Sequence, residues 1–238
     1  MAFDKNKAER IMVALDYAHA QQAEVLVKSL AGIPCYMKVG MQLFYSAGLS
    51  FVQMLKEQGY HVFLDLKMHD IPNTVKGGAE SIARLGVDMF NVHAAGGKAM
   101  MEAALEGLEK GLQGGRKPMV IAVTQLTSTG VTVMNEEIGI AGTVEDAVLR
   151  YARLAREAGL NGVVASPLEV VRIKDTCGSD FVTVTPGIRP AGADIGDQTR
   201  VMTPAEAFAQ GTDYIVIGRP ITAAQDPRGA LEAILASV

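Results

Sequence analysis

Four charged side chains have the types and the spacing to act on a substrate. Asp65 and Lys67 lie two positions apart in one apolar run, Asp70 follows shortly after, and Lys38 lies in an earlier apolar run. Alternate residues of a strand point to the same side, so Asp65 and Lys67 are expected to share a face. Any one of these charges could instead be a solvated strand end or half of a structural ion pair. With Asp16, at the end of the first apolar run, Lys38, Asp65 and Lys67 make four charges expected in or at the ends of strands, and four together favour a catalytic site.

The mixture of signs in this group indicates what Lys67 could do. Carboxylates beside a lysine favour its protonated, charged form. A lysine that forms a Schiff base needs an apolar pocket or a neighbouring cation. Lys38 could be that cation, but Asp65 and Asp70 balance the charge. We therefore expect Lys67 to donate a proton rather than to act as a nucleophile.

These side chains need a scaffold that brings the ends of several strands together. Short runs rich in Val and Ile alternate with longer segments at helical spacing, a pattern typical of parallel strands covered by crossover helices. Strands are expected at 11–16, 36–40, 62–67, 89–93, 119–125, 162–166, 181–186 and 214–218. Helices are expected at 20–30, 50–58, 74–84, 99–111, 143–158, 168–175, 204–210 and 227–236.

Eight such units predict a (β/α)₈ TIM barrel, with residues 1–238 forming a single domain. The main alternative is an open doubly wound sheet, but no G-x-G-x-x-G turn follows the first strand. In a barrel the active site lies at the carboxyl ends of the strands, where Asp16, Lys38, Asp65 and Lys67 are predicted to lie.

Composition narrows the class of protein. Apolar residues make up 49% of the 238 and charged residues 20%, which suits a folded domain with a sizeable core. A net charge of -4 gives no general attraction to nucleic acid or to anionic membranes, and no apolar run approaches a membrane span of about 20 residues. Cys35 and Cys177 share no metal-binding spacing and are expected to be free thiols. We expect a cytoplasmic enzyme that acts on a small molecule.

Residues 63–74, with the sequence FLDLKMHDIPNT, resemble the D-x-K-x-x-D signature of the orotidine 5′-phosphate decarboxylase family. The core of that signature also occurs in related barrels, such as 3-keto-L-gulonate-6-phosphate decarboxylase and hexulose-phosphate synthase, which bind a metal ion there. Other segments resemble the bacterial decarboxylases in order and spacing: VALD at 13–16, KVG at 38–40, QLTS at 125–128, TPGIRP at 185–190, GDQTR at 196–200 and IGRP at 217–220. The resemblance therefore spans essentially the whole chain.

The resemblance implies a reaction that needs no cofactor and no metal ion. Orotidine 5′-monophosphate (OMP) would lose CO₂ to give UMP in de novo pyrimidine nucleotide biosynthesis, with Lys67 protonating C6. One alternative is a metal-dependent sugar-phosphate decarboxylase or aldolase that uses the same Asp65 and Lys67. Another is a phosphosugar-binding barrel without catalytic activity.

The resemblance also assigns roles to single residues. Asp16 and Lys38 would hold the ribose hydroxyls, and Thr127 would contact the edge of the pyrimidine. Lys38, Asp65, Lys67 and Asp70 would form an alternating charged network at the reacting carbon. The phosphate would be held by Arg189, Gln198, Gly218 and Arg219.

Two further expectations concern closure and assembly. The glycine-containing segment 187–200 follows the seventh predicted strand and is predicted to be a mobile lid that closes on the phosphate. The resemblance implies a homodimer in which Asp70, Ile71 and Thr74 are contributed across the interface.

The histidines His61, His69 and His93 lack the spacing of a metal cluster, and structural roles are favoured for them, with His93 the best candidate for a hydrogen bond at the site.

Overall fold

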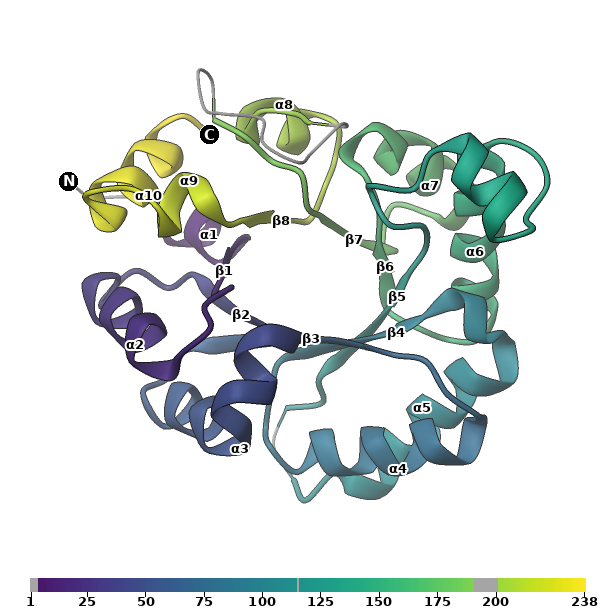
Figure 1. Ribbon diagram of the computed structural model, residues 1–238, viewed down its shortest axis with the longest axis horizontal. Helices are drawn as coiled ribbons and strands as arrows, with labels where there is room; N and C mark the ends of the chain where they lie inside the picture. Colours follow the sequence, from purple (N-terminus) through teal and green to yellow (C-terminus); the bar gives the residue numbers. More distant parts are fainter. Residues whose placement is uncertain (1–3, 115, 191–200) are drawn as a thin grey trace.

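Eight parallel strands close into a barrel in the order of the sequence, so the predicted TIM barrel is confirmed (Figure 1). The computed structural model describes residues 4–114, 116–190 and 201–238. Strand β8 pairs with β1 and closes the ring. The strands are β1 (Ile11–Ala14), β2 (Tyr36–Gly40), β3 (His61–Met68), β4 (Met89–His93), β5 (Met119–Val123), β6 (Gly162–Val164), β7 (Val182–Thr185) and β8 (Tyr214–Ile217).

Helices surround the ring of strands (Figure 1). They are α1 (Lys5–Ala8), α2 (Ala20–Ser29), α3 (Met41–Glu57), α4 (Pro72–Ala83), α5 (Lys98–Gly111), α6 (Val144–Glu157), α7 (Val170–Cys177), α8 (Pro204–Ala209), α9 (Arg219–Thr222) and α10 (Pro227–Ala236). Short 3₁₀ turns lie at η1 (Ala94–Gly96) and η3 (Pro167–Glu169), and a π-helical turn, η2, at Val133–Glu137. Among the described residues no helix is both long and apolar enough to cross a membrane.

Several predicted boundaries were off by two residues or more, including the ends of the strands predicted at 119–125 and 162–166, which are β5 (Met119–Val123) and β6 (Gly162–Val164). Two of the errors have identifiable reasons. Helix α3 begins at Met41, whereas the sequence predicted a start at residue 50. The first part was missed because Gly48, with φ 70, kinks the helix and interrupts its apolar periodicity. Asp16 was expected to end the first strand, but β1 ends at Ala14. The Leu15 N–H makes the last bond to β2, at 2.9 Å from the Lys38 carbonyl oxygen, and the Tyr17 N–H then turns back to the Leu15 carbonyl oxygen. Asp16 therefore lies in the loop that follows β1.

The amino-terminal end of the barrel is closed by packing and by side-chain hydrogen bonds. The interior contains the buried cluster Met12, Tyr36, Phe63, Met89, Ile121 and Val184. At the amino-terminal side of this cluster, the residue that precedes each of β4, β6 and β8 accepts a hydrogen bond through its side chain from a backbone N–H of the preceding strand. The pairs are Asp88 with Val62 at 2.8 Å, Asn161 with Val120 at 2.8 Å and Asp213 with Thr183 at 2.7 Å. Since this end is filled, a ligand must enter from the carboxyl ends of the strands.

Helices α4 and α5 pack with their backbones close together, which supports the loop after β3. A Cβ on Gly107 would lie 2.0 Å from the Lys76 carbonyl oxygen, and one on Gly111 would lie 2.3 Å from that of Glu80. Any larger residue at these positions would push the helices apart. Because α4 follows directly from the loop that carries Asp70, this contact helps to set the position of that loop.

Candidate active site

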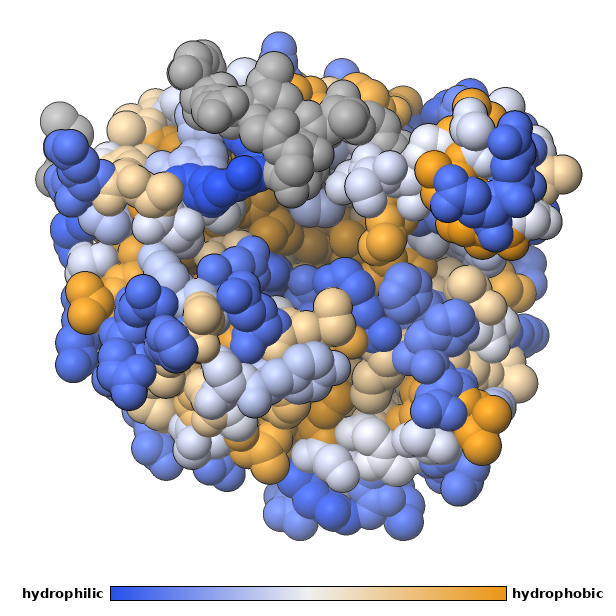
Figure 2. Space-filling view, in the orientation of Figure 1, coloured by the Kyte–Doolittle hydropathy of each residue, from blue (hydrophilic) through white to orange (hydrophobic). Residues whose placement is uncertain are grey.

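A cavity of about 520 Å³ opens at the carboxyl ends of the strands. Figure 2 shows this face hollowed at the centre of the ring, with apolar residues in its floor and hydrophilic residues around it. Among the residues that line the cavity are Asp16, Lys38, Phe63, Asp65, Lys67, Gln125, Leu126, Thr127, Ser128, Arg189, Gly218 and Arg219. Side chains from strands and loops far apart in the sequence therefore meet in one cavity.

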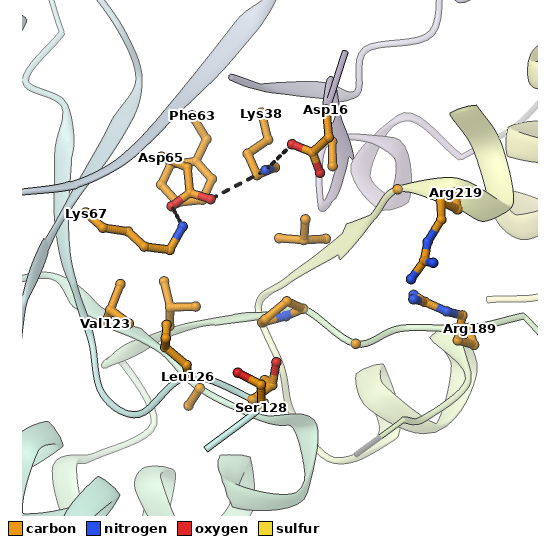
Figure 3. Close-up of a pocket in the computed structure, with 18 of the residues that line it drawn as sticks. Asp16, Lys38, Phe63, Asp65, Lys67, Val123, Leu126, Ser128, Arg189 and Arg219 are labelled. Atoms are coloured by element: carbon orange, nitrogen blue, oxygen red, sulfur yellow. Dashed lines mark hydrogen bonds and ion pairs between the residues drawn. The ribbon is translucent and has the colours of Figure 1, made fainter. Parts of the chain in front are cut away.

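Four charged side chains form a continuous array of alternating sign along one wall (Figure 3). Lys38 Nζ lies 2.9 Å from Asp16 Oδ1 and 3.4 Å from Asp65 Oδ2. Lys67 Nζ donates to the other oxygen of Asp65, Oδ1, at 2.6 Å. The predicted grouping of Lys38, Asp65 and Lys67 is thus present in the structure, and Asp16 extends it.

Burial and neighbouring charge shift the pKa values of Asp65 and Lys38 in opposite directions. Burial alone would raise the pKa of the Asp65 carboxyl, but the Lys38 and Lys67 ammonium groups hold that pKa below its usual range. Burial would lower the pKa of Lys38, but Asp65 and Asp16 outweigh it and raise that pKa. Both groups therefore stay charged near neutral pH, with Asp65 held between two cations.

Lys67 has an unusual backbone conformation. Its φ is 52, and no other non-glycine residue in the described part of the chain has a positive φ. The strand register is interrupted here: Leu64 pairs with Phe90, but the next pair is Met68 with Val92. Strand β3 therefore has extra residues opposite β4, and this bulge turns the Lys67 side chain toward Asp65 and the cavity.

The opposite side of the cavity is cationic. In Figure 3 the guanidinium groups of Arg189 and Arg219 point toward one another, across the cavity from Asp65 and Lys67. Two hydrogen bonds fix Arg189. Its backbone N–H donates to the Met202 carbonyl oxygen at 2.9 Å, and its guanidinium Nη1 donates to the Ile188 carbonyl oxygen at 2.9 Å. Gly218 precedes the short helix α9, which begins with Arg219. Two planar guanidinium groups and a helix start are suited to a phosphate.

Some predicted site residues do not reach this cavity. Asp70, Ile71 and Thr74 are exposed, lie outside the set that lines it, and surround the start of α4. The Asp70 carboxylate accepts from the Ile71 N–H at 2.7 Å. Gln198, and residues 191–200 of the predicted lid, lie outside the described residues. Of the four residues of the predicted network, Lys38, Asp65 and Lys67 line the cavity of their own chain, and Asp70 does not.

Several residues of the site were missed from the sequence. Phe63 and Ser128 line the cavity, and the buried Asn91 contacts both Asp65 and Lys67 without lining it. Asn91 had a signal that could have found it, because it is a lone amide in the apolar strand segment MFNVH. A buried polar side chain in such a strand needs partners, and these partners are at the site.

The histidines divide between the two ends of the barrel. His61 lies 3.1 Å from Asp88 at the amino-terminal end, far from the cavity, as the structural role predicts. His69 and His93 lie next to each other at the carboxyl end, with ring centroids 5.4 Å apart. Burial, and then the nearby charges of His69 and Lys67, lower the pKa of His93. No set of three or more His, Cys, Asp or Glu side chains suited to a metal ion occurs among the described residues.

Comparison with known proteins assigns the chain to a family. The sequence model of the orotidine 5′-phosphate decarboxylase / HUMPS family matches residues 9–234. The chain belongs to this family. Among the relatives of this family member is a protein named orotidine 5′-phosphate decarboxylase from Bacillus cereus (strain AH820), 53% identical over 95% of this chain and 96% of that protein. A protein of the same name from Bacillus anthracis is also 53% identical, with the same coverage.

Solved structures show the same relationship for this family member. The crystal structure of orotidine 5′-phosphate decarboxylase from Lactobacillus acidophilus superimposes with a TM-score of 0.85 and 44% identity, covering 94% of this chain and 96% of that one. A conserved protein from Geobacillus kaustophilus superimposes with a TM-score of 0.84 and 46% identity, covering 95% of this chain and 98% of that one. The predicted family membership is therefore confirmed.

Proposed function

We propose that the chain catalyses the decarboxylation of OMP to UMP and CO₂ in pyrimidine nucleotide biosynthesis. The observation that carries the proposal is the division of one cavity into two parts, an alternating charged array on one side and two guanidinium groups on the other. A nucleoside monophosphate has a phosphate at one end and a reacting base at the other, so it matches this division. The family and the names of its relatives support the same activity.

The cationic side would bind the phosphate. Phosphate sites in TIM barrels commonly lie after strands seven and eight, at the start of a short extra helix. Arg189 follows β7, and Gly218 and Arg219 follow β8 at the start of α9. We assign the phosphate to these residues, together with Gln198, and the closing of segment 187–200 over it belongs to the same proposal. The ribose hydroxyls are assigned to Asp16 and Lys38, and the pyrimidine edge to Thr127, which also lines the cavity.

The charged array would act on the carbon that loses CO₂. Departure of CO₂ leaves an electron pair on C6, with no adjacent carbonyl or imine that could delocalise it. An ammonium group held close to C6 would stabilise that pair and then protonate it, which completes the conversion to UMP. We assign this role to Lys67, because Asp65 holds its Nζ at 2.6 Å and Lys38 keeps Asp65 charged.

A proton donor alone does not account for such a reaction. Very slow reactions need a barrier reduction on the order of 20 kcal/mol, whereas general acid catalysis contributes about 10²- to 10⁴-fold. The remainder would come from charges that are already in place, and from phosphate binding used to hold the base against them. Asp65, which is 8% exposed and hydrogen-bonded to Lys38, Lys67 and Asn91, would be the fixed centre of the array.

We further propose that the working unit is a homodimer. Asp70, Ile71 and Thr74 would enter the neighbouring subunit's cavity, where Asp70 would complete the network beside Lys67. The exposure of these three residues at the start of α4, outside their own cavity, supports this arrangement. Large apolar side chains are also exposed on α3, where Met41, Tyr45 and Leu49 are 43%, 73% and 51% exposed. A second subunit would cover such a surface.

The proposed compartment is the cytoplasm, where thiols stay reduced. Cys35 and Cys177 are both buried and free. Burial raises the pKa of Cys35 to about 12, so this thiol is unreactive at neutral pH.

The direct test is to add purified protein to OMP and follow the loss of its ultraviolet absorbance, with UMP and CO₂ measured as products. Turnover should continue after exhaustive treatment with a chelator, because Lys67 rather than a metal ion is assigned to C6. Loss of activity on chelation and its recovery with Mg²⁺ would instead favour a metal-dependent sugar-phosphate decarboxylase or aldolase. Binding of UMP without any turnover would indicate a nucleotide-binding barrel that is not an enzyme.

A further inference from the structure

Asn91 connects the two charged residues at the centre of the site although it does not line the cavity. It lies in the middle of β4 and is 1% exposed. Its Oδ1 accepts from the Lys67 N–H at 2.8 Å, and its Nδ2 donates to Asp65 Oδ1 at 2.7 Å. That same carboxylate oxygen accepts from Lys67 Nζ at 2.6 Å. Asn91, Asp65 and Lys67 thus form a closed ring of hydrogen bonds.

The bulge in β3 explains why a side chain is needed at this point. Between the pairs Leu64–Phe90 and Met68–Val92, strand β3 has three residues and β4 has only Asn91. Backbone pairing cannot satisfy all of these residues, and Lys67 adopts φ 52, a conformation that L-residues rarely adopt. The Lys67 N–H is instead bonded to the Asn91 side chain, which takes the place of a neighbouring-strand carbonyl.

The chemistry of the two partners determines the side chain that can fill this position. The Lys67 N–H can only donate, and the Asp65 carboxylate can only accept, so the group between them must have an acceptor and a donor on neighbouring atoms. A primary amide has both. Aspartate would bring a second carboxylate against Asp65, and leucine, of similar shape, would leave both partners unsatisfied.

We propose that Asn91 is a positioning residue for Lys67, and that its single amide holds both the backbone from which Lys67 projects and the carboxylate that orients the Lys67 ammonium. The inference rests on the proposed function, in which that ammonium acts at C6. Asn91 itself does not touch the substrate. Replacing Asn91 should therefore slow the chemical step, which depends on the position of the ammonium, and leave the affinity for substrate largely unchanged.

The chain offers a matched control at the opposite end of the barrel. Asn161 also uses its side-chain Oδ1 to accept a backbone N–H from the adjacent strand, Val120, at 2.8 Å. It lies before β6, on the amino-terminal side, and outside the residues that line the cavity. Asn161→Ala removes a bond of the same kind without touching the site. It reports the effect of lost stability alone.

The kinetic test compares Asn91→Leu and Asn91→Ala with wild type and with Asn161→Ala. A displacement of about 1 Å of a catalytic group can cost about 10²-fold in rate, so kcat on OMP should fall by about that factor in both Asn91 variants. KM and the affinity for UMP should stay within about threefold of wild type, because the phosphate and ribose contacts remain. Asn161→Ala should keep wild-type kcat. Folded Asn91 variants with kcat within about threefold of wild type, or with a raised KM alone, would overturn the proposal.

A second readout does not depend on turnover, so it separates this inference from the proposed function. Hydrogen exchange of the Lys67 amide should be slow in wild type and should become fast in Asn91→Ala, while amides of the β4 backbone stay protected. Rapid exchange of the Lys67 amide in wild type would show that the bond to Asn91 is not maintained and would overturn the inference, even if neither Asn91 variant folds. Wild-type protein that protects this amide but does not decarboxylate OMP would refute the proposed function and leave the geometry intact.

Discussion

Mixing two inactive variants should restore activity if Asp70 serves the site of the neighbouring subunit. The variants are Lys67→Ala, which removes the proposed proton donor, and Asp70→Asn, which removes the charge proposed to come from the partner. Within one chain Asp70 is exposed and bonded to the Ile71 N–H, whereas Lys67 projects into the cavity. In a mixed dimer one site therefore collects both lesions, and the other site has an intact Lys67 and an intact Asp70.

The size of the recovery follows from counting sites. With random exchange of equal amounts, about half of the dimers are mixed, and each has one intact site of two in a twofold-symmetric assembly. Activity should therefore return to about a quarter of the wild-type value. Across other mixing ratios it should follow the product of the two variant fractions, with its maximum at equal amounts.

The assay is OMP turnover after co-refolding of the two variants over a series of ratios, with mixed dimers verified by mass. A matched control is the pair Lys67→Ala and Asp65→Asn. Both residues line the cavity of their own chain, with Lys67 Nζ 2.6 Å from Asp65 Oδ1. Each site of a mixed dimer therefore lacks one of the two, and no activity should return. If mixed dimers of Lys67→Ala and Asp70→Asn stay inactive, Asp70 either acts in its own subunit or has no part in the site.

Contacts around the cavity carry three more predictions. Arg219→Ala should mostly raise KM, by about 10- to 100-fold, since its guanidinium is assigned to phosphate, and should lower kcat by a smaller factor because phosphate binding also holds the base against the charged array; a fall in kcat alone would contradict this. Gly40→Ala should lower kcat/KM about 10-fold or more, because a Cβ there would lie 3.1 Å from Lys38 Nζ and 3.2 Å from Asp16 Oδ1; unchanged steady-state kinetics would refute it. Burial and nearby positive charge lower the pKa of His93 in the folded protein, so the free energy of unfolding should be highest above about pH 6.5 and should decrease as the pH falls. In urea unfolding measured across pH, His93→Gln should reduce this decrease. An unaltered pH profile would exclude His93 as its cause.

The barrel was predictable from the sequence because its signal is repeated along the whole chain. Each buried strand is a short apolar run and each helix a longer amphipathic one, so an error at one boundary does not change the order of the units. The missed first half of α3 illustrates this, since the kink at Gly48 disturbed the period without disturbing the fold. The pairing of Asp65 with Lys67 was predicted from their spacing of two in one strand, although in the structure the bulge at Lys67, rather than regular alternation, turns its side chain toward Asp65.

Other parts of the site depend on relationships that a linear sequence does not contain. The role of Asn91 requires the bulge opposite it, and the bulge is visible only when β3 and β4 are paired. The positive φ of Lys67 could not be predicted either, since lysine has no preference for that conformation. Asp70 lies outside the cavity of its own chain, and its proposed place in a neighbouring subunit's site cannot be read from one sequence. Its assignment came from resemblance rather than from local pattern.

Steady-state kinetics of Lys67→Ala, with a parallel measurement of its affinity for UMP, would show whether the Lys67 ammonium acts on charge that develops at C6. We expect kcat to fall by at least about 10³-fold while UMP binds with nearly wild-type affinity, because the ammonium acts mainly in the transition state. Lys28→Ala, which changes an exposed lysine on α2, should match wild type in both measurements. If Lys67→Ala kept more than about a tenth of wild-type kcat, Lys67 could not be the proton donor.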